Sequence, residues 1–175
     1  FRGNHGDGLY IKGGQYTVKE STFERNLVNG LYYGERAKGE VYSCIFTQNK
    51  TAHLGLKGAE VSVKETQFIE GEGVGVFCLS SGDLHLQSVE ILDQRGVGVL
   101  IDGSADEGEG EGSDPQEITL IDSSDSTERL RLDVPNHNEE ETLERSEESA
   151  PQITSCTLKA EGCRISNGGA PGILI

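Results

Sequence analysis

Six short phrases recur along the chain, and each places alternating apolar residues directly after a leading residue that is usually glycine. They are Gly8-Leu-Tyr-Ile, Gly30-Leu-Tyr-Tyr, His53-Leu-Gly-Leu, Gly75-Val-Phe-Cys, Gly98-Val-Leu-Ile and Gly172-Ile-Leu-Ile. The first five begin at residues 8, 30, 53, 75 and 98, so successive spacings are 22, 23, 22 and 23 residues. A fixed period of this size is typical of a solenoid. Such a protein works through a long exposed surface rather than one deep pocket.

Aligning the phrases predicts three short strands in each coil. Period-two alternation places one set of first-strand residues inward, namely Leu9 and Ile11, Leu31 and Tyr33, Leu54 and Leu56, Val76 and Cys78, and Val99 and Ile101. The residues between them point outward: Tyr10, Tyr32, Gly55, Phe77 and Leu100. The second strand is built around Val18, Val41, Val63 and Leu86, and the third around Phe23, Phe46, Phe68 and Ile91.

These segments are rich in β-branched and aromatic residues and show no sustained helical period, which favours strands. Coils of 22–23 residues leave no room for a crossover helix, so each strand must pair in parallel with its counterpart one coil away. The prediction is an all-β, right-handed, single-stranded parallel β-helix that spans residues 1–175 as one domain. Asn26 and Asn49 follow the third strand and are predicted to bond along a coil corner as structural residues.

The period is interrupted after Gly98, and two acidic stretches explain the interruption. Residues 104–114 carry five acids and no base, and residues 135–150 carry six acids and one Arg. Both are interpreted as flexible loop insertions at one coil corner, each followed by a Pro-Gln that re-enters the second strand. Removing them leaves Leu130 and Leu132 as a further inward pair, with Ile173 and Ile175 as the last.

The net charge of −15 argues against nucleic acid and anionic membrane as partners, because both require clustered Lys and Arg. No apolar run reaches the ~20 residues of a membrane span, and no secretory signal is present. The chain also lacks an initiator Met, so we expect a fragment. Cys44 and Cys78 fall in strand-like phrases and are interpreted as reduced core thiols, which favours a cytoplasmic location over the alternative of secretion.

The coil pattern resembles the parallel β-helix repeats of the pectate-lyase-like superfamily, and this resemblance implies two kinds of catalytic site to search for. The carboxylate pattern of its hydrolases is not found, and His5 and Asp7 are interpreted as parts of a Gly-rich turn. For a Ca²⁺-dependent lyase the best acidic pair is Asp102 and Asp133, predicted to lie roughly 5 Å apart on successive coils. Turn-closing aspartates are the favoured interpretation and a metal site is the alternative, so no cofactor is expected.

The glycine-led repeats and the acidic insertion also resemble the carbohydrate-binding and sugar-hydrolase type repeats of F-box proteins ten and eleven, and those of the SHC SH2-domain-binding protein and Nessun Dorma family. This resemblance implies a non-catalytic scaffold linked to ubiquitin-ligase substrate choice or to cell division. We expect a protein partner, or alternatively a glycan, on a surface formed by Tyr10, Tyr32, Phe77 and Leu100. The alternative function is a polysaccharide lyase or glycoside hydrolase whose catalytic coils lie partly outside this chain.

Overall fold

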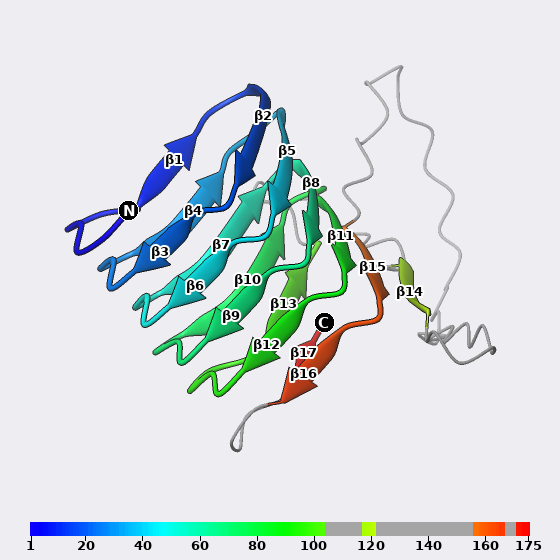
Figure 1. The fold of residues 1–175 in the computed structure, drawn as a ribbon. Coiled ribbons are helices and arrows are strands. Elements are labelled where there is room, and N and C mark those ends of the chain that lie inside the picture. The colour runs from blue at the N-terminus through cyan, green and yellow to red at the C-terminus, as the bar shows by residue number, and fades with distance from the viewer. Residues whose placement is uncertain (104–116, 122–155, 167–170) are drawn as a thin grey trace, which may run out of the picture.

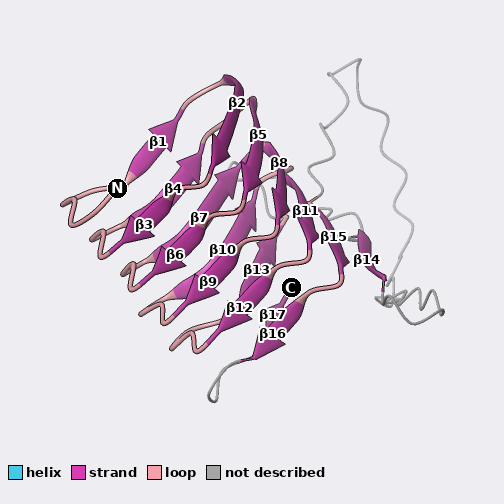
Figure 2. Cartoon of the chain, viewed as in Figure 1, coloured by secondary structure: helices cyan, strands magenta, loops and turns pink. Residues whose placement is uncertain are grey.

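The fold is a stack of β-strand coils, seen from the side in Figure 1. This computed structural model describes residues 1–103, 117–121, 156–166 and 171–175. Within them every regular element is a strand, and Figure 2 shows that short loops join the strands of the regular coils. Four consecutive coils, β1–β3, β4–β6, β7–β9 and β10–β12, each supply one strand to each of three sheets. The predicted right-handed parallel β-helix is confirmed.

The three sheets run along the length of the stack. The first contains, in spatial order, β1 (Leu9–Ile11), β4 (Asn29–Tyr33), β7 (Ala52–Lys57), β10 (Val74–Leu79), β13 (Val99–Asp102) and β17 (Ile173–Leu174). The second contains β2 (Gly14–Lys19), β5 (Ala37–Tyr42), β8 (Glu60–Lys64), β11 (Asp83–Gln87), β15 (Thr157–Glu161) and β14 (Glu117–Ile121). The third contains β3 (Thr22–Glu24), β6 (Ile45–Thr47), β9 (Gln67–Ile69), β12 (Glu90–Leu92) and β16 (Arg164–Ser166).

The core is the space between the sheets, and each sheet contributes rows of like residues to it. The predicted first-strand pairs from Leu31 to Ile101 are buried, as are the second-strand row and the third-strand row. The phenylalanines of the third strand contact one another: Phe23 and Phe46 are stacked with centroids 4.6 Å apart, and Phe46 and Phe68 are tilted with centroids 4.8 Å apart. Because parallel in-register pairing superposes equivalent residues, one apolar choice per coil builds a continuous core.

The glycine that leads most phrases marks a close approach between coils. A Cβ atom on Gly8 would lie 2.5 Å from the carbonyl oxygen of Gly30, and one on Gly30 would lie 2.7 Å from that of His53. Real Cβ atoms do not approach a carbonyl oxygen so closely, so a larger residue here would push neighbouring coils apart. The sequence feature that reveals the solenoid is therefore also a steric requirement of its stacking.

An amide ladder runs along the corner between the third sheet and the first. The Asn26 backbone N–H and side-chain Nδ2 both donate to Asn49 Oδ1, at 3.1 Å and 2.9 Å, and Asn4 donates to Asn26 Oδ1 in the same way. Asn49 Nδ2 donates to the Phe23 carbonyl at 3.0 Å. Asn26 and Asn49 are fully buried, so the prediction that they are structural corner residues is confirmed.

The order of the last coils differs from the prediction. β14 precedes β15 in the chain, yet β15 pairs with β11 and β14 lies beyond it at the sheet edge, as Figure 1 shows. In the first sheet β17 pairs with β13, so Ile173 stacks on Val99 in the place predicted for Leu130. That register prediction is wrong. Ile173 packs against the core as expected, whereas Ile175 is 49% exposed.

Strand positions in a periodic stack are equivalent, so more than one segment of the chain can take them. Residues 156–166 supply β15 and β16 joined by a short turn at Gly162, whose φ is +58°, and so cover β11 and β12 together. Leu130, Leu132, Asp133 and the two acidic stretches at 104–114 and 135–150 lie outside the described residues. Among the described residues we find no helix long and apolar enough to cross a membrane.

Candidate functional site

A row of large side chains runs along the outer face of the first sheet. Parallel pairing sets Tyr10 beside Tyr32, Tyr32 beside Gly55, Gly55 beside Phe77, and Phe77 beside Leu100. Leu174 of β17 extends the row beyond Leu100. We call these six positions the outer row: Tyr10, Tyr32, Gly55, Phe77, Leu100 and Leu174. The structure thus brings all four residues predicted to bind a partner onto one surface, and adds Leu174, which sequence reasoning missed.

The rings of the outer row contact one another. Tyr10 and Tyr32 are stacked, with centroids 5.3 Å apart and planes 5° from parallel. Tyr32 and Phe77 come from coils that are not adjacent, yet their centroids are only 6.1 Å apart, at an angle of 51°. A continuous aromatic contact, made by rings from three coils, therefore spans four coils.

Gly55 makes this contact possible. A Cβ atom on Gly55 would lie 2.3 Å from Phe77 Cζ, so the Phe77 ring lies over the space that the missing side chain leaves. Sequence reasoning placed Gly55 on the outer face but did not explain it. The signal was available, because a single glycine in a row of large residues on adjacent strands indicates a ring lying across it.

The outer row is accessible to a partner while still partly packed. Tyr10 is 54% exposed and Leu174 is 45% exposed, and Tyr32, Phe77 and Leu100 are half-buried. Partial burial raises the pKa of Tyr32, and the neighbouring Tyr10 hydroxyl raises it further by a smaller amount. The Tyr32 hydroxyl therefore stays protonated at neutral pH and can both donate and accept a hydrogen bond.

A charged groove of about 490 Å³ lies along the corner that precedes the first sheet. Two rows of equivalent residues line it: Arg25, Gln48, Glu70 and Asp93 in the first, and Leu27, Lys50, Glu72 and Arg95 in the second. In the first row Arg25 Nε donates to Gln48 Oε1 at 2.8 Å, and Gln48 Nε2 donates to Glu70 Oε2 at 3.1 Å. The groove thus presents both acidic and basic side chains, which suits a partner with mixed charge.

His53 is buried at the same corner, where the amide ladder is interrupted. The ladder position of its coil is Gly71, which has no side chain, and a Cβ there would lie 2.8 Å from His53 Nε2. Asn49 Nδ2 donates to His53 Nδ1 at 3.0 Å, so the neutral ring carries its proton on Nε2. Burial lowers the pKa of His53 to about 4, against the opposing effect of the Ile69 backbone and Gln94. His53 is therefore neutral at physiological pH and fills the gap in the ladder.

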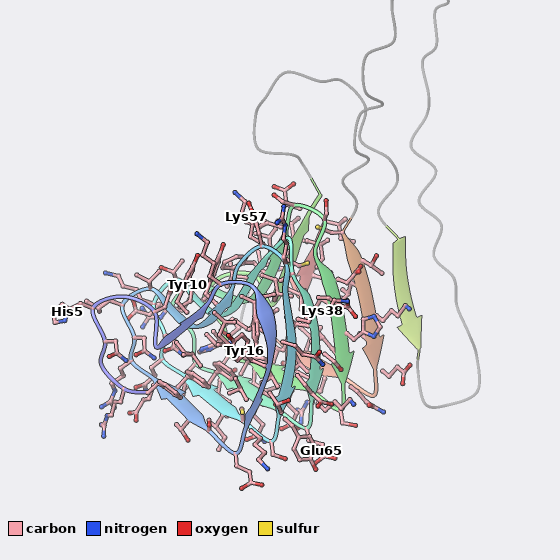
Figure 3. All side chains as sticks on the ribbon, turned by 90° about the horizontal axis from the view of Figure 1, so that it is seen from above. His5, Tyr10, Tyr16, Lys38, Lys57 and Glu65 are labelled. Atoms are coloured by element: carbon pink, nitrogen blue, oxygen red, sulfur yellow. The ribbon has the colours of Figure 1, made fainter. Side chains whose placement is uncertain are left out.

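The candidate catalytic residues are dispersed. Asp7 Oδ1 accepts a hydrogen bond from the Asn29 backbone of the next coil at 3.0 Å, and His5 is exposed and extends away from the coils (Figure 3). Asp102 ends β13 and is exposed, and its predicted partner Asp133 lies outside the described residues. The register that placed these two aspartates together is not the one observed, because β17 pairs with β13. The described part of the chain contains no group of three or more His, Cys, Asp or Glu side chains that could hold a metal ion.

Two exposed ion pairs lie on the outside of the second sheet. Lys64 pairs with Glu40 of the preceding coil at 3.1 Å, rather than with its chain neighbour Glu65. Lys38 makes a similar pair with Glu60 across two coils. These pairs are exposed and contribute little to stability, so this face carries no candidate site.

Comparison with known proteins gives a family match. The family described as right handed beta helix region matches residues 7–116, which is more than half of the chain. No curated protein and no solved structure matches the chain.

Proposed function

Because the chain belongs to the right-handed β-helix family, we propose that it is a non-catalytic recognition module that binds a protein partner through the outer row. The observation that carries the proposal is the continuous, partly exposed contact of Tyr10, Tyr32 and Phe77 on one sheet face. Aromatic residues are enriched at the energetic centres of protein interfaces. They lose little conformational entropy on binding when neighbouring rings already hold them in place.

A protein partner is favoured over a glycan because of how the rings are used. Sugars stack on open aromatic faces, whereas Tyr10 and Tyr32 each have one ring face covered by the other. Beyond Phe77 the outer row continues with the aliphatic side chains of Leu100 and Leu174, which suit an apolar protein surface. The mixed-charge groove at the neighbouring corner would add orientation and selectivity.

The proposal extends to an intracellular assembly. The resemblance to the F-box and SHC SH2-domain-binding repeats suggests ubiquitin-ligase substrate recognition or a role in cell division, with the β-helix as the part that selects the partner. Three buried free thiols, Cys44, Cys78 and Cys156, support a reducing compartment such as the cytoplasm.

The test is quantitative affinity capture with the wild-type chain and the double variant Tyr32→Ala/Phe77→Ala. The matched control is Tyr16→Ala/Tyr42→Ala, which removes two exposed aromatic rings from the second sheet. We expect the affinity of the first variant for its specific partners to fall by about thirtyfold or more, because a single interface hot spot contributes about 2 kcal/mol or more. The control should retain them. Circular dichroism and thermal unfolding would establish that both variants are folded.

Two outcomes would contradict the proposal. One is unchanged capture by a folded outer-row variant, and the other is an equal loss in the second-sheet control. A polysaccharide-cleavage screen with and without Ca²⁺ tests the alternative of catalysis, for which the carboxylates of Glu70, Glu72 and Asp93 in the groove are the available acids. Turnover that disappears in Glu70→Gln/Glu72→Gln would replace recognition by catalysis.

A further inference from the structure

Two cysteines from distant parts of the chain meet where the first sheet turns into the second. Cys78 lies on β10 with its side chain inward, and Cys156 directly precedes β15, 78 residues later. Cys78 is fully buried and Cys156 is 1% exposed. The two cysteines are in contact, and each thiol shifts the pKa of the other.

The backbone places Cys156 beside the site that the Cys78 sulfur occupies. A Cβ atom on Gly82 would lie 2.5 Å from Cys78 Sγ, so the sulfur occupies the space above a glycine. Asp83 pairs with Thr157, which makes Gly82 and Cys156 equivalent positions on neighbouring coils. The Cys156 side chain therefore starts one coil beyond the site that Cys78 Sγ fills. Cys156 Sγ also lies 3.7 Å from the Cys78 carbonyl and 3.4 Å from the Asp102 carbonyl.

The other two cysteines have a different and simpler role. Cys44 Sγ donates to the Tyr42 carbonyl at 3.3 Å, and Cys163 Sγ donates to the Glu161 carbonyl at 3.4 Å. Ser21 and Thr66 make the same bond to the residue two positions earlier at the equivalent corner. Cys44 and Cys163 are thus turn residues that a hydroxyl can replace, whereas Cys78 and Cys156 do not follow this pattern.

We propose that Cys78 and Cys156 form a redox-active dithiol that is oxidised to a disulfide by small-molecule disulfides of the glutathione class. The disulfide would bind the last coil, β15 to β17, covalently to the coil of β10. Residues 156–166 take a strand position that periodicity alone does not assign to them, so a bond at this point would secure the pairing with β11. The proposal is independent of partner binding by the outer row.

The chemistry proceeds by two thiol–disulfide exchanges. The Cys156 thiolate attacks one sulfur of oxidised glutathione, whose S–S bond breaks and releases one glutathione thiolate. Cys78 then loses its proton to the released thiolate and attacks Cys156 Sγ, which expels the second glutathione. In total two protein S–H bonds are lost, one protein S–S bond forms, and one glutathione disulfide is reduced to two glutathione thiols.

The electronic arrangement supports Cys156 as the attacking group. The Cys78 thiol lowers the pKa of the Cys156 thiol, and the Cys156 thiol together with burial raises the pKa of Cys78. Both sulfurs are shielded from solvent, so the exchange requires local opening of the corner at Cys156.

The test exposes the reduced, native chain to a series of oxidised-to-reduced glutathione ratios, followed by alkylation in denaturant and peptide mapping. The expected result is a fall from four alkylated cysteines to two, with one disulfide-linked peptide pair that contains Cys78 and Cys156. The control variant Cys44→Ser/Cys163→Ser should form the same link and fall from two alkylated cysteines to none. The oxidised form of this control variant should unfold at a higher denaturant concentration than the reduced form of the same variant.

Three results would overturn the proposal. These are four free thiols at every ratio, a link that involves Cys44 or Cys163, or a Cys156–glutathione adduct that never resolves. A Cys78–Cys156 link that forms only after the chain has been unfolded would also overturn it, because the native contact would then have no role. Since the main experiment uses the wild-type chain, none of these readings depends on whether a Cys78 or Cys156 variant folds.

Discussion

Replacing His53 by glutamine should change how the stability of the chain depends on pH. His53 is fully buried, and the groups packed against its ring are the phenyl rings of Phe46 and Phe68 and the amides of Asn49 and Gln94. All four groups are uncharged, so none of them stabilises a protonated imidazole by charge. The neutral ring is the form that fits the corner.

The magnitude follows from the pKa, which burial lowers from 6.5 to about 4. As the pH falls from 6.5 towards 4, the unfolded chain binds a proton at His53 that the folded chain does not bind. The free energy of unfolding therefore decreases through this range and, for His53, is independent of pH above it. A difference of about 2.5 pKa units corresponds to a loss of about 3 kcal/mol by pH 4.

Urea unfolding of the wild-type chain and His53→Gln at several pH values between 7 and 4 measures this effect. The informative quantity is the difference between the two unfolding free energies, because carboxylate titration is common to both chains. This difference should change by about 3 kcal/mol in favour of the variant as the pH falls to 4. His85→Gln removes an exposed histidine and serves as the matched control. Wild-type and His53→Gln curves that remain parallel would refute the argument that the folded corner excludes the charged ring.

Three further substitutions test the packing. Asn49→Ala leaves several buried ladder groups without partners and should lower the free energy of unfolding by about 3–5 kcal/mol. The control Gln48→Ala, at an exposed neighbouring residue, should lower it by about 1 kcal/mol or less. Similar losses for the two variants in urea unfolding would contradict the stabilising role of the ladder. Tyr33→Phe removes a buried hydroxyl that has no hydrogen-bond partner among the described residues. The free energy of unfolding, measured by thermal unfolding, should therefore rise by about 1 kcal/mol rather than fall. Gly55→Ala should displace the Phe77 ring, reduce near-ultraviolet circular dichroism and destabilise the chain by about 1–2 kcal/mol; an unchanged spectrum would count against the ring packing described.

Much of the fold could be predicted because a solenoid repeats one local pattern. The inward rows through Leu31, Val41 and Phe46 were predicted from alternation alone, since each coil must bury the same few positions. The corner role of Asn49 was predicted for the same reason: an amide at a fixed period can bond to its counterpart.

The sequence predicted which residues share the outer face of the first sheet, but it did not predict how their side chains contact one another. Alternation placed Tyr10, Tyr32 and Phe77 on one face, because residues two apart in a strand share a face. Their mutual contact depends on Phe77 turning back over Gly55, which is a choice of side-chain rotamer and cannot be inferred from spacing. The role of His53 was missed because it requires the absent side chain of Gly71 two strands later.

Periodicity in the chain establishes the coil, its length, its parallel pairing and its inward residues, since all of these follow from interactions that every repeat makes with its neighbours. The order of the last strands, the Cys78–Cys156 contact and the burial of His53 follow only from the tertiary structure. They depend on which of several equivalent positions a segment occupies, and that choice is made by pairing and side-chain packing between residues far apart in the chain. A repeat therefore carries the architecture locally, whereas the features that distinguish this protein arise at the places where the repeat is broken.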